Sequence, residues 1–107
     1  MVAEKYNLKI IYDGAHSFGT YYNNKPLLEY GDISTCSFHA TKLFHTAEGG
    51  CIIAKDKSLI DKMVLFRQFG HIGDNYLSIG INGKSSELHA AMGLCVLPEI
   101  NNIIKKR

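Results

Sequence analysis

The chain has 107 residues, a formal net charge of +2 and 46% hydrophobic residues, which is typical of one globular domain and excludes wholesale disorder. Twelve basic and ten acidic residues give no strong field, so charge offers no case for a nucleic-acid partner or an anionic membrane surface. No apolar run approaches the roughly 20 residues that cross a bilayer, and residues 1–6 lack the pattern of a secretory signal. We therefore expect a cytoplasmic protein without a membrane partner.

The cysteines and histidines predict neither disulfides nor a metal site. Cys36, Cys51 and Cys95 are an odd number without a CxxC pair, so we expect three reduced, buried thiols that pack as small apolar residues. The spacing of Cys36, His39 and His45 matches no common metal-ligand pattern.

Three buried strands and a small hairpin are predicted in the first half of the chain. Residues 9–12 form a β-branched and aromatic run that ends at Asp13, and residues 33–38 and 51–54 form two further buried runs. Between the first two, residues 19–32 are rich in turn formers, and Tyr21-Tyr22 is expected to pair with Leu27-Leu28 in a small hairpin.

The second half is helical in pattern. Ser58 is expected to cap a helix that runs to Phe69, because apolar residues recur there at three- and four-residue steps. Residues 71–83 contain three glycines and several polar residues, and are expected to form a loop. Ser85 or Ser86 then caps a second helix whose apolar face comprises Leu88, Ala91, Met92 and Cys95, and which Pro98 interrupts before residues 99–107 resume it.

This order of elements favours an α/β fold. Parallel neighbours need a crossover that usually contains a helix, but little sequence separates the second and third buried strands, so these two are expected to be antiparallel. The chain as a whole has the pattern of a piece of a larger α/β domain.

Two candidate groups follow the ends of buried strands, where open α/β sheets bind ligands. Asp13 ends the first strand, with His16 three residues further on. By itself, Asp13 is equally suited to capping the following turn and to serving a ligand. Lys42 follows the second strand, with Ser37 five residues before it. A desolvated lysine can attack a carbonyl to form a Schiff base, although the position alone also allows Lys42 to point into solvent.

Together, the carboxylate and the lysine match the needs of pyridoxal 5′-phosphate (PLP). This cofactor requires a lysine to hold its aldehyde and a carboxylate to keep its pyridine nitrogen protonated, so that the ring acts as an electron sink. A hydroxyl shortly before the lysine can reach the phosphate. The sequence therefore predicts a PLP site that involves Asp13, Ser37 and Lys42.

Four motifs, in order, resemble the DegT/DnrJ/EryC1/StrS family of PLP-dependent aminotransferases that act on nucleotide-linked sugars. The resemblance covers roughly residues 8–98 and lies in YDGAHSFG (12–19), GD (31–32), SFHATK with EGG (37–42, 48–50), and GINGKSSELHAAMGL (80–94). It implies a fold-type-I (aspartate aminotransferase-like) large domain, in which a mainly parallel sheet has one antiparallel strand; residues 50–54 correspond to that strand.

The resemblance also implies roles for single residues. Asp13 pairs with the pyridine nitrogen, His16 lies near the ring hydroxyl, and Ser37 binds the phosphate. Lys42 is both the covalent anchor and the general base. Asn82 reaches the phosphate of the cofactor in a neighbouring subunit, so the active site is shared across a homodimer. The implied reaction transfers an amine from an amino-acid donor, usually glutamate, to a keto group on the sugar.

The family's enzymes are much longer than this chain. Residues 1–107 are accordingly expected to be the central piece of the PLP-binding large domain, without its N-terminal part and without the C-terminal small domain, and to have no transaminase activity alone. The alternative is a non-catalytic remnant that acts as an oligomeric interaction module, covering its sheet edges and apolar helix faces with copies of itself.

Overall fold

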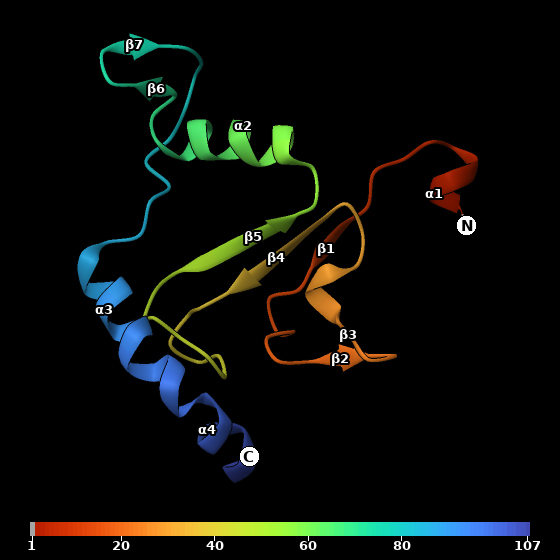
Figure 1. The fold of residues 1–107 in the computed structure, drawn as a ribbon, viewed down its shortest axis with the longest axis vertical. Helices are drawn as coiled ribbons and strands as arrows, with labels where there is room; N and C mark the ends of the chain where they lie inside the picture. The colour runs from red at the N-terminus through yellow and green to blue at the C-terminus, as the bar shows by residue number, and fades with distance from the viewer. Residues whose placement is uncertain (1) are drawn as a thin grey trace.

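The centre of the molecule is a three-stranded mixed sheet. The structure is a computed structural model and describes residues 2–107. Strands β1 (Ile11–Asp13), β4 (Ile33–Ser37) and β5 (Gly50–Ala54) lie in the order β1-β4-β5 (Figure 1). β1 is parallel to β4, whereas β5 is antiparallel to β4. The three predicted strands and the predicted antiparallel pair are confirmed.

The parallel pairing of β1 with β4 begins at Asp32. The backbone N–H groups of Asp32 and Ile33 donate to the carbonyl of Ile10 (3.0 and 3.2 Å), and the Ile10 N–H donates to Asp32 Oδ2 (2.9 Å). Lys9 Nζ lies 3.1 Å from the other carboxylate oxygen. These contacts place Ile11 opposite Ile33 and Asp13 opposite Thr35.

The segment that links β1 to β4 contains the predicted hairpin. Its strands are β2 (Tyr21–Tyr22) and β3 (Lys25–Pro26), followed by the 3-10 helix η1 (Leu27–Glu29). The turn residues Asn23 and Asn24 have φ of 48° and 58°, the left-handed conformation that two-residue hairpin turns of type I′ require. The second strand of the hairpin is Lys25–Pro26 and not the predicted Leu27-Leu28, which belongs to η1.

Helix α2 (Lys57–Arg67) lies beside β5, and a second hairpin follows it (Figure 1). Its cap is Asp56 rather than the predicted Ser58, because the Asp56 carboxylate accepts the N–H groups of Ser58 and Leu59. The predicted loop 71–83 contains β6 (His71–Ile72) and β7 (Asn75–Tyr76), so that prediction was wrong in part. Gly70 precedes this hairpin with φ of 74°, where a side chain is strained.

The C-terminal arm comprises α3 (Glu87–Val96), the 3-10 helix η2 (Leu97–Glu99) and α4 (Ile100–Lys106). Ser86 caps α3, as predicted, and Pro98 interrupts the helical run. The predicted apolar face of α3 is not covered, since Leu88 is 83% exposed and Cys95 is exposed. Gly93 is the buried residue of α3, and a Cβ there would lie 2.9 Å from Thr46 Cγ2.

Little of the apolar surface is covered within residues 2–107. Cys36 and Phe44 are the buried hydrophobic residues, while β1, predicted to be buried, is exposed, and Cys51 is only partly buried. The accessible surface is 8247 Å², against about 6,000 Å² for a compact protein of this mass. The radius of gyration is 16.1 Å, against about 13 Å for a compact domain of this length.

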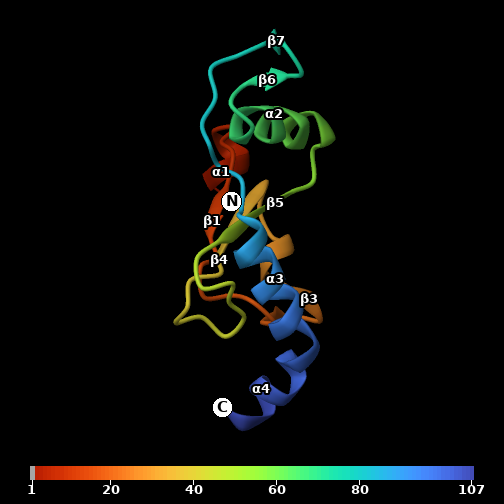
Figure 2. The ribbon, with the colours of Figure 1, turned by 90° about the vertical axis from the view of Figure 1, so that its left-hand side faces the viewer.

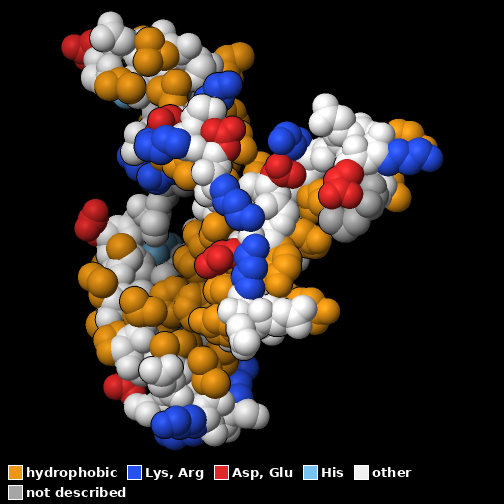
Figure 3. Space-filling view, turned by 45° about the vertical axis from the view of Figure 1, so that its right-hand side comes forward, with side chains coloured by type: hydrophobic (Ala, Val, Ile, Leu, Met, Phe, Trp, Pro, Cys, Tyr) orange, Lys and Arg blue, Asp and Glu red, His pale blue; other side chains and the backbone are white. Residues whose placement is uncertain are grey.

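The shape accounts for these values. The molecule measures 47 × 42 × 19 Å, so it is thin when viewed edge-on (Figure 2). Apolar side chains gather in a broad area on the face shown in Figure 3. The short helix α1 (Val2–Lys5) precedes β1 and buries no residue. The fold is therefore an open layer with a small core, not a closed domain.

The close approach of α3 to the loop between β4 and β5 predicts a size limit at Gly93. We expect Gly93→Val to lower the free energy of unfolding by about 1–3 kcal/mol, the usual cost of overpacking, because its side chain enters the space of the buried Thr46. The exposed Ala90→Val on the same helix is the control and costs only about 0.5 kcal/mol in helix propensity. Urea unfolding measures both, and equal losses would contradict the contact.

The carboxylate at the start of the sheet predicts a pH dependence. The Ile10 N–H, and after it Lys9, hold the pKa of Asp32 below its ordinary value of 3.8. Its contribution to stability is present above about pH 4 and is lost as the pH falls through the lower folded-state pKa. Urea unfolding of the wild type and Asp32→Asn should therefore differ at pH 7 and converge near the acid limit. Asp74→Asn, in an exposed turn, should follow the wild type throughout.

Candidate functional site

Two loops meet at one edge of the sheet because β1 and β4 are parallel. The loop after β1 begins at Asp13 and the loop after β4 begins at Ser37, so both leave the sheet at its C-terminal edge. Asp13 pairs with Thr35, and Ser37 lies two residues further along β4 on the same face of the sheet, about 7 Å beyond. The edge therefore presents a carboxylate and a hydroxyl on one side.

The carboxylate of Asp13 caps the turn that carries His16. Its Oδ1 accepts the Ala15 N–H (3.1 Å), and the Ser17 N–H donates to the Gly14 carbonyl (2.9 Å). Gly14 is buried, and a Cβ there would lie 2.5 Å from a Leu28 methyl group, so the turn is pressed against η1. Within residues 2–107, Asp13 Oδ2 has no hydrogen-bond partner. Asp13 therefore caps the turn with one oxygen, and its other oxygen is available to a ligand.

Lys42 contacts His16 across the two loops. Lys42 Nζ lies 3.1 Å from His16 Nε2, and the lysine is partly buried rather than extended into solvent. An ammonium group only donates hydrogen bonds, so the imidazole Nε2 is the acceptor when the lysine is charged. His39, three residues before Lys42, contacts Thr41 Oγ1 (2.9 Å) and the Glu48 carboxylate (3.5 Å).

The loop of Lys42 is closed by backbone hydrogen bonds at its base. The Phe38 N–H donates to the Gly49 carbonyl (2.8 Å), and the Thr46 N–H donates to the Phe38 carbonyl (2.9 Å). The Thr46 hydroxyl donates to the Glu48 carbonyl (2.8 Å). These bonds fix both ends of the loop, while the Lys42 N–H donates to the His39 carbonyl within it (2.9 Å).

Three phenylalanines join the two loops. The rings of Phe18 and Phe44 stack with centroids 4.8 Å apart, and Phe38 packs edge-on against Phe44 at 4.9 Å. Phe44 is 7% exposed. Phe18 and Phe38 lie within the family motifs but had no predicted role, and no role was predicted for Phe44. The sequence does contain one indication of a shared role, because Phe18 and Phe44 each lie two residues beyond a polar candidate residue.

Ser37 and Asn82 differ in their relation to this edge. Ser37 Oγ accepts the His39 N–H (3.2 Å), which leaves its own proton free to donate to a ligand. Asn82 pairs with Gln68 in an isolated bridge, and the Gly83 N–H donates to the Arg67 carbonyl (2.9 Å). The segment of Asn82 is thus bound to the end of α2, and the structure does not bring Asn82 to the other four predicted residues.

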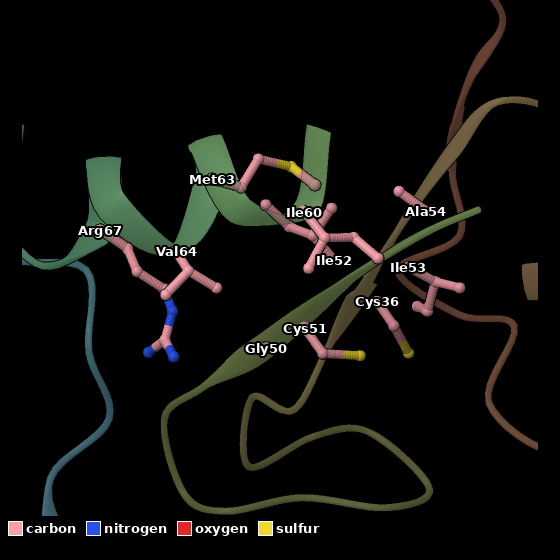
Figure 4. Close-up of a pocket in the computed structure, with 10 residues that line it drawn as sticks. All are labelled: Cys36, Gly50, Cys51, Ile52, Ile53, Ala54, Ile60, Met63, Val64 and Arg67. Atoms are coloured by element: carbon pink, nitrogen blue, oxygen red, sulfur yellow. The ribbon is translucent and has the colours of Figure 1, made fainter. Parts of the chain in front are cut away.

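A pocket that none of the predicted site residues lines lies between β5 and α2. A cavity of about 670 Å³ between β5 and α2 is lined by apolar side chains of both, with the Cys36 and Cys51 thiols on its floor and Arg67 at one side (Figure 4). Burial raises the pKa of the Cys51 thiol to about 11 and raises that of Cys36 as well. A second pocket of about 370 Å³ has Asp13 in its wall. The predicted site residues contribute to the second pocket only.

The described part of the chain has neither a cluster of metal-ligand side chains nor a helix that could span a membrane. Residues 2–107 contain no group of three or more His, Cys, Asp or Glu side chains arranged to hold a metal ion. Among the same residues, no helix has the length and apolarity that a transmembrane span requires.

The fold and the site define a class of protein. An amine beyond one strand of a mixed α/β sheet, with a carboxylate at the end of the neighbouring parallel strand, is the arrangement of fold-type-I aminotransferases, and solved aminotransferases share this fold with TM-scores of 0.85 and 0.86. The profile of the DegT/DnrJ/EryC1/StrS aminotransferase family matches residues 1–107. The chain belongs to this family.

Three relatives describe the similarity. The chain is 44% identical over 107 residues to a dTDP-4-amino-4,6-dideoxy-D-glucose transaminase of Shigella dysenteriae, a match to 99% of this chain and 29% of that protein. Helicobacter pylori PseC, an aminotransferase involved in pseudaminic acid biosynthesis, is 34% identical, with 94% of this chain and 28% of PseC covered and a TM-score of 0.85. A Bacillus cereus protein assigned to the PLP-dependent aminotransferases is 29% identical, with 99% and 29% covered and a TM-score of 0.86. The chain spans about 30% of the length of its curated relatives.

Proposed function

We propose that residues 1–107 are the central part of the PLP-binding domain of an aminotransferase that acts on a keto group of a nucleotide-linked sugar. The observation that carries this proposal is the 3.1 Å contact of Lys42 Nζ with His16 at the sheet edge that also bears Asp13. Family membership and the sugar transaminases among the relatives support the substrate class. The amino donor in this proposal is an amino acid such as glutamate.

The side chains at this edge fit PLP. An amine, an imidazole, a carboxylate and a hydroxyl lie on two adjoining loops, and one oxygen of Asp13 and the proton of Ser37 are available to a ligand. When bound, PLP supplies an electron sink that stabilises negative charge at the carbon of an attached amine. These four side chains are thus sufficient for the covalent, pyridine and phosphate contacts of that cofactor.

Each residue then has a stated task. Lys42 would supply the amine that holds the cofactor covalently and would also move a proton as general base. Asp13, oriented by the Ala15 N–H, would keep the pyridine nitrogen protonated through its free oxygen. Ser37 would donate to the phosphate, and His16 would contact the ring hydroxyl. Asn82 would serve the cofactor of a partner subunit, so the working enzyme in this proposal is a homodimer.

The open surface supports the proposal that these residues are one part of a larger domain. The chain exposes about 2,000 Å² more than a compact protein of its mass, and the exposed area includes β1 and apolar positions of β5 such as Ile52. The remaining polypeptide of such an enzyme covers this surface. The chain alone is accordingly expected to be inactive.

A chimeric enzyme tests the catalytic role of Lys42. Residues 1–107 replace the matching segment of the Shigella dysenteriae transaminase, and the protein is assayed with PLP, glutamate and the keto-sugar nucleotide of that enzyme. We expect turnover, a visible cofactor absorbance, and borohydride-trapped PLP on Lys42. Lys42→Ala should abolish the trapped adduct and lower turnover at least about 10²-fold, as loss of a general base does.

Lys62→Ala, an exposed lysine of α2, is the matched control and should behave as the parent chimera. A chimera that folds and dimerises but traps no PLP on Lys42 would contradict the proposal. So would a Lys42→Ala chimera that retains turnover.

A second candidate function, the oligomeric interaction module, is favoured by the same open surface. An excess of about 2,000 Å² per chain is of the size of obligate interfaces, and β5 is an uncharged edge strand of the kind that pairs with another chain. On this alternative, the purified chain sediments as a dimer or larger species, Lys42→Ala changes nothing, and Ile52→Lys on the exposed edge lowers the association. A chain that stays monomeric at all concentrations in sedimentation velocity would exclude it.

A further inference from the structure

The loop of His16 and the loop of Lys42 contact each other through residues that have the same spacing on both loops. On the first loop, Phe18 follows His16 by two residues, and on the second, Phe44 follows Lys42 by two residues. The polar pair is in contact at 3.1 Å, and the aromatic pair is stacked at 4.8 Å with an interplanar angle of 20°. Phe18 also packs edge-on against Phe38 at 6.2 Å. The two loops are therefore joined by one hydrogen bond and by ring contacts.

The polar contact is too weak to order two loops by itself. A single hydrogen bond adds little net stability, because the same groups bond to water in the unfolded chain, and ordering a lysine side chain costs at least as much in rotamer entropy. The ring contact contributes more, because a stacked aromatic pair gains stability beyond that of the area it buries. Phe38 and the Gly93 face of α3 pack against Phe44 from two further sides.

We propose that the stacked pair Phe18–Phe44 is the positioning device of the site: it holds the loop of His16 against the loop of Lys42, so that the imidazole stays within hydrogen-bond distance of the lysine amine. Both phenylalanines are positioning residues and touch no reacting atom. The proposal rests on the proposed function for its consequence, namely that the held amine captures an aldehyde faster than a free one. The contact itself is a property of the chain without any cofactor.

The test uses the full chain and two readouts. Without cofactor, an NMR cross-peak between the His16 ring and the Lys42 side chain reports the contact. With PLP and borohydride, mass spectrometry measures capture at Lys42 relative to the exposed Lys62. Phe18→Leu and Phe44→Leu keep an apolar side chain but remove the ring and thus the stack. We expect both to lose the cross-peak and to lower relative capture about fivefold, the factor that the loss of one hydrogen bond gives.

Matched variants separate positioning from general stability. Phe18→Tyr keeps the stack and should retain both readouts, and Phe66→Leu, on the exposed side of α2, should change neither. The double variant His16→Leu with Phe18→Leu should capture PLP no more slowly than His16→Leu alone, because Phe18 acts only through the His16 contact. Amide spectra report whether each variant is folded.

Several outcomes overturn the proposal. Leu variants that keep the cross-peak or the capture rate, a Phe18→Tyr that loses as much as Phe18→Leu, and an unsubstituted chain without the cross-peak all do so. If Phe44→Leu unfolds the chain, the half-buried position 18 decides; if Phe18→Leu unfolds it too, the rings are ordinary core and the proposal fails. An unsubstituted chain that shows the cross-peak but captures PLP no faster at Lys42 than at Lys62 keeps the contact and overturns the proposed consequence, which is faster capture. The Lys42→Ala chimera tests the proposed function separately.

Discussion

The parallel pairing of β1 with β4 is the constraint on which the candidate site depends. Because both strands run in the same direction, their following loops leave the sheet at one edge, and residues 26 positions apart in the chain come within hydrogen-bond distance. The carboxylate of Asp32 begins this pairing by accepting the Ile10 N–H. A slip of one residue would turn Asp13 to the opposite face of the sheet, away from Ser37.

The site is assembled from local contacts rather than from a large core. Phe44 is the one bulky apolar side chain that is buried among residues 2–107, and it lies between Phe18, Phe38 and α3. The strands beside it remain open on their outer edges. The loops of His16 and Lys42 therefore have their own packing, which is separate from the packing that the outer faces of the sheet and of α2 still need.

Much of the fold was predictable because strand ends and caps leave short-range signals. The β-branched runs, the Asn23-Asn24 turn and the Ser86 cap each acted through residues close in sequence. The hairpin β6–β7 was missed because its glycines indicate turns without indicating which residues pair between them. The apolar periodicity of α3 indicated a face that another element covers, but the covering element cannot be deduced from the periodicity. Among the described residues of α3, only Gly93 is buried. For the site, the order of the motifs predicted Asp13, His16 and Lys42. The contact between the Phe18 and Phe44 rings could not be deduced from the sequence, because it depends on how the two loops fold.

These features bear on how the two candidate functions are related. The excess surface lies on the sheet edges and the helix faces, whereas the Lys42–His16 contact lies on loops that the aromatic rings already join. Further polypeptide or another copy of the chain could cover these edges. Either one would contact β1, β5, α2 and α3. The Lys42–His16 contact lies on loops, whereas much of the surface in need of cover lies on strand edges and helix faces. A chain that associates through its edges can therefore keep this contact, and loss of the lysine amine would remove the proposed chemistry without removing the association.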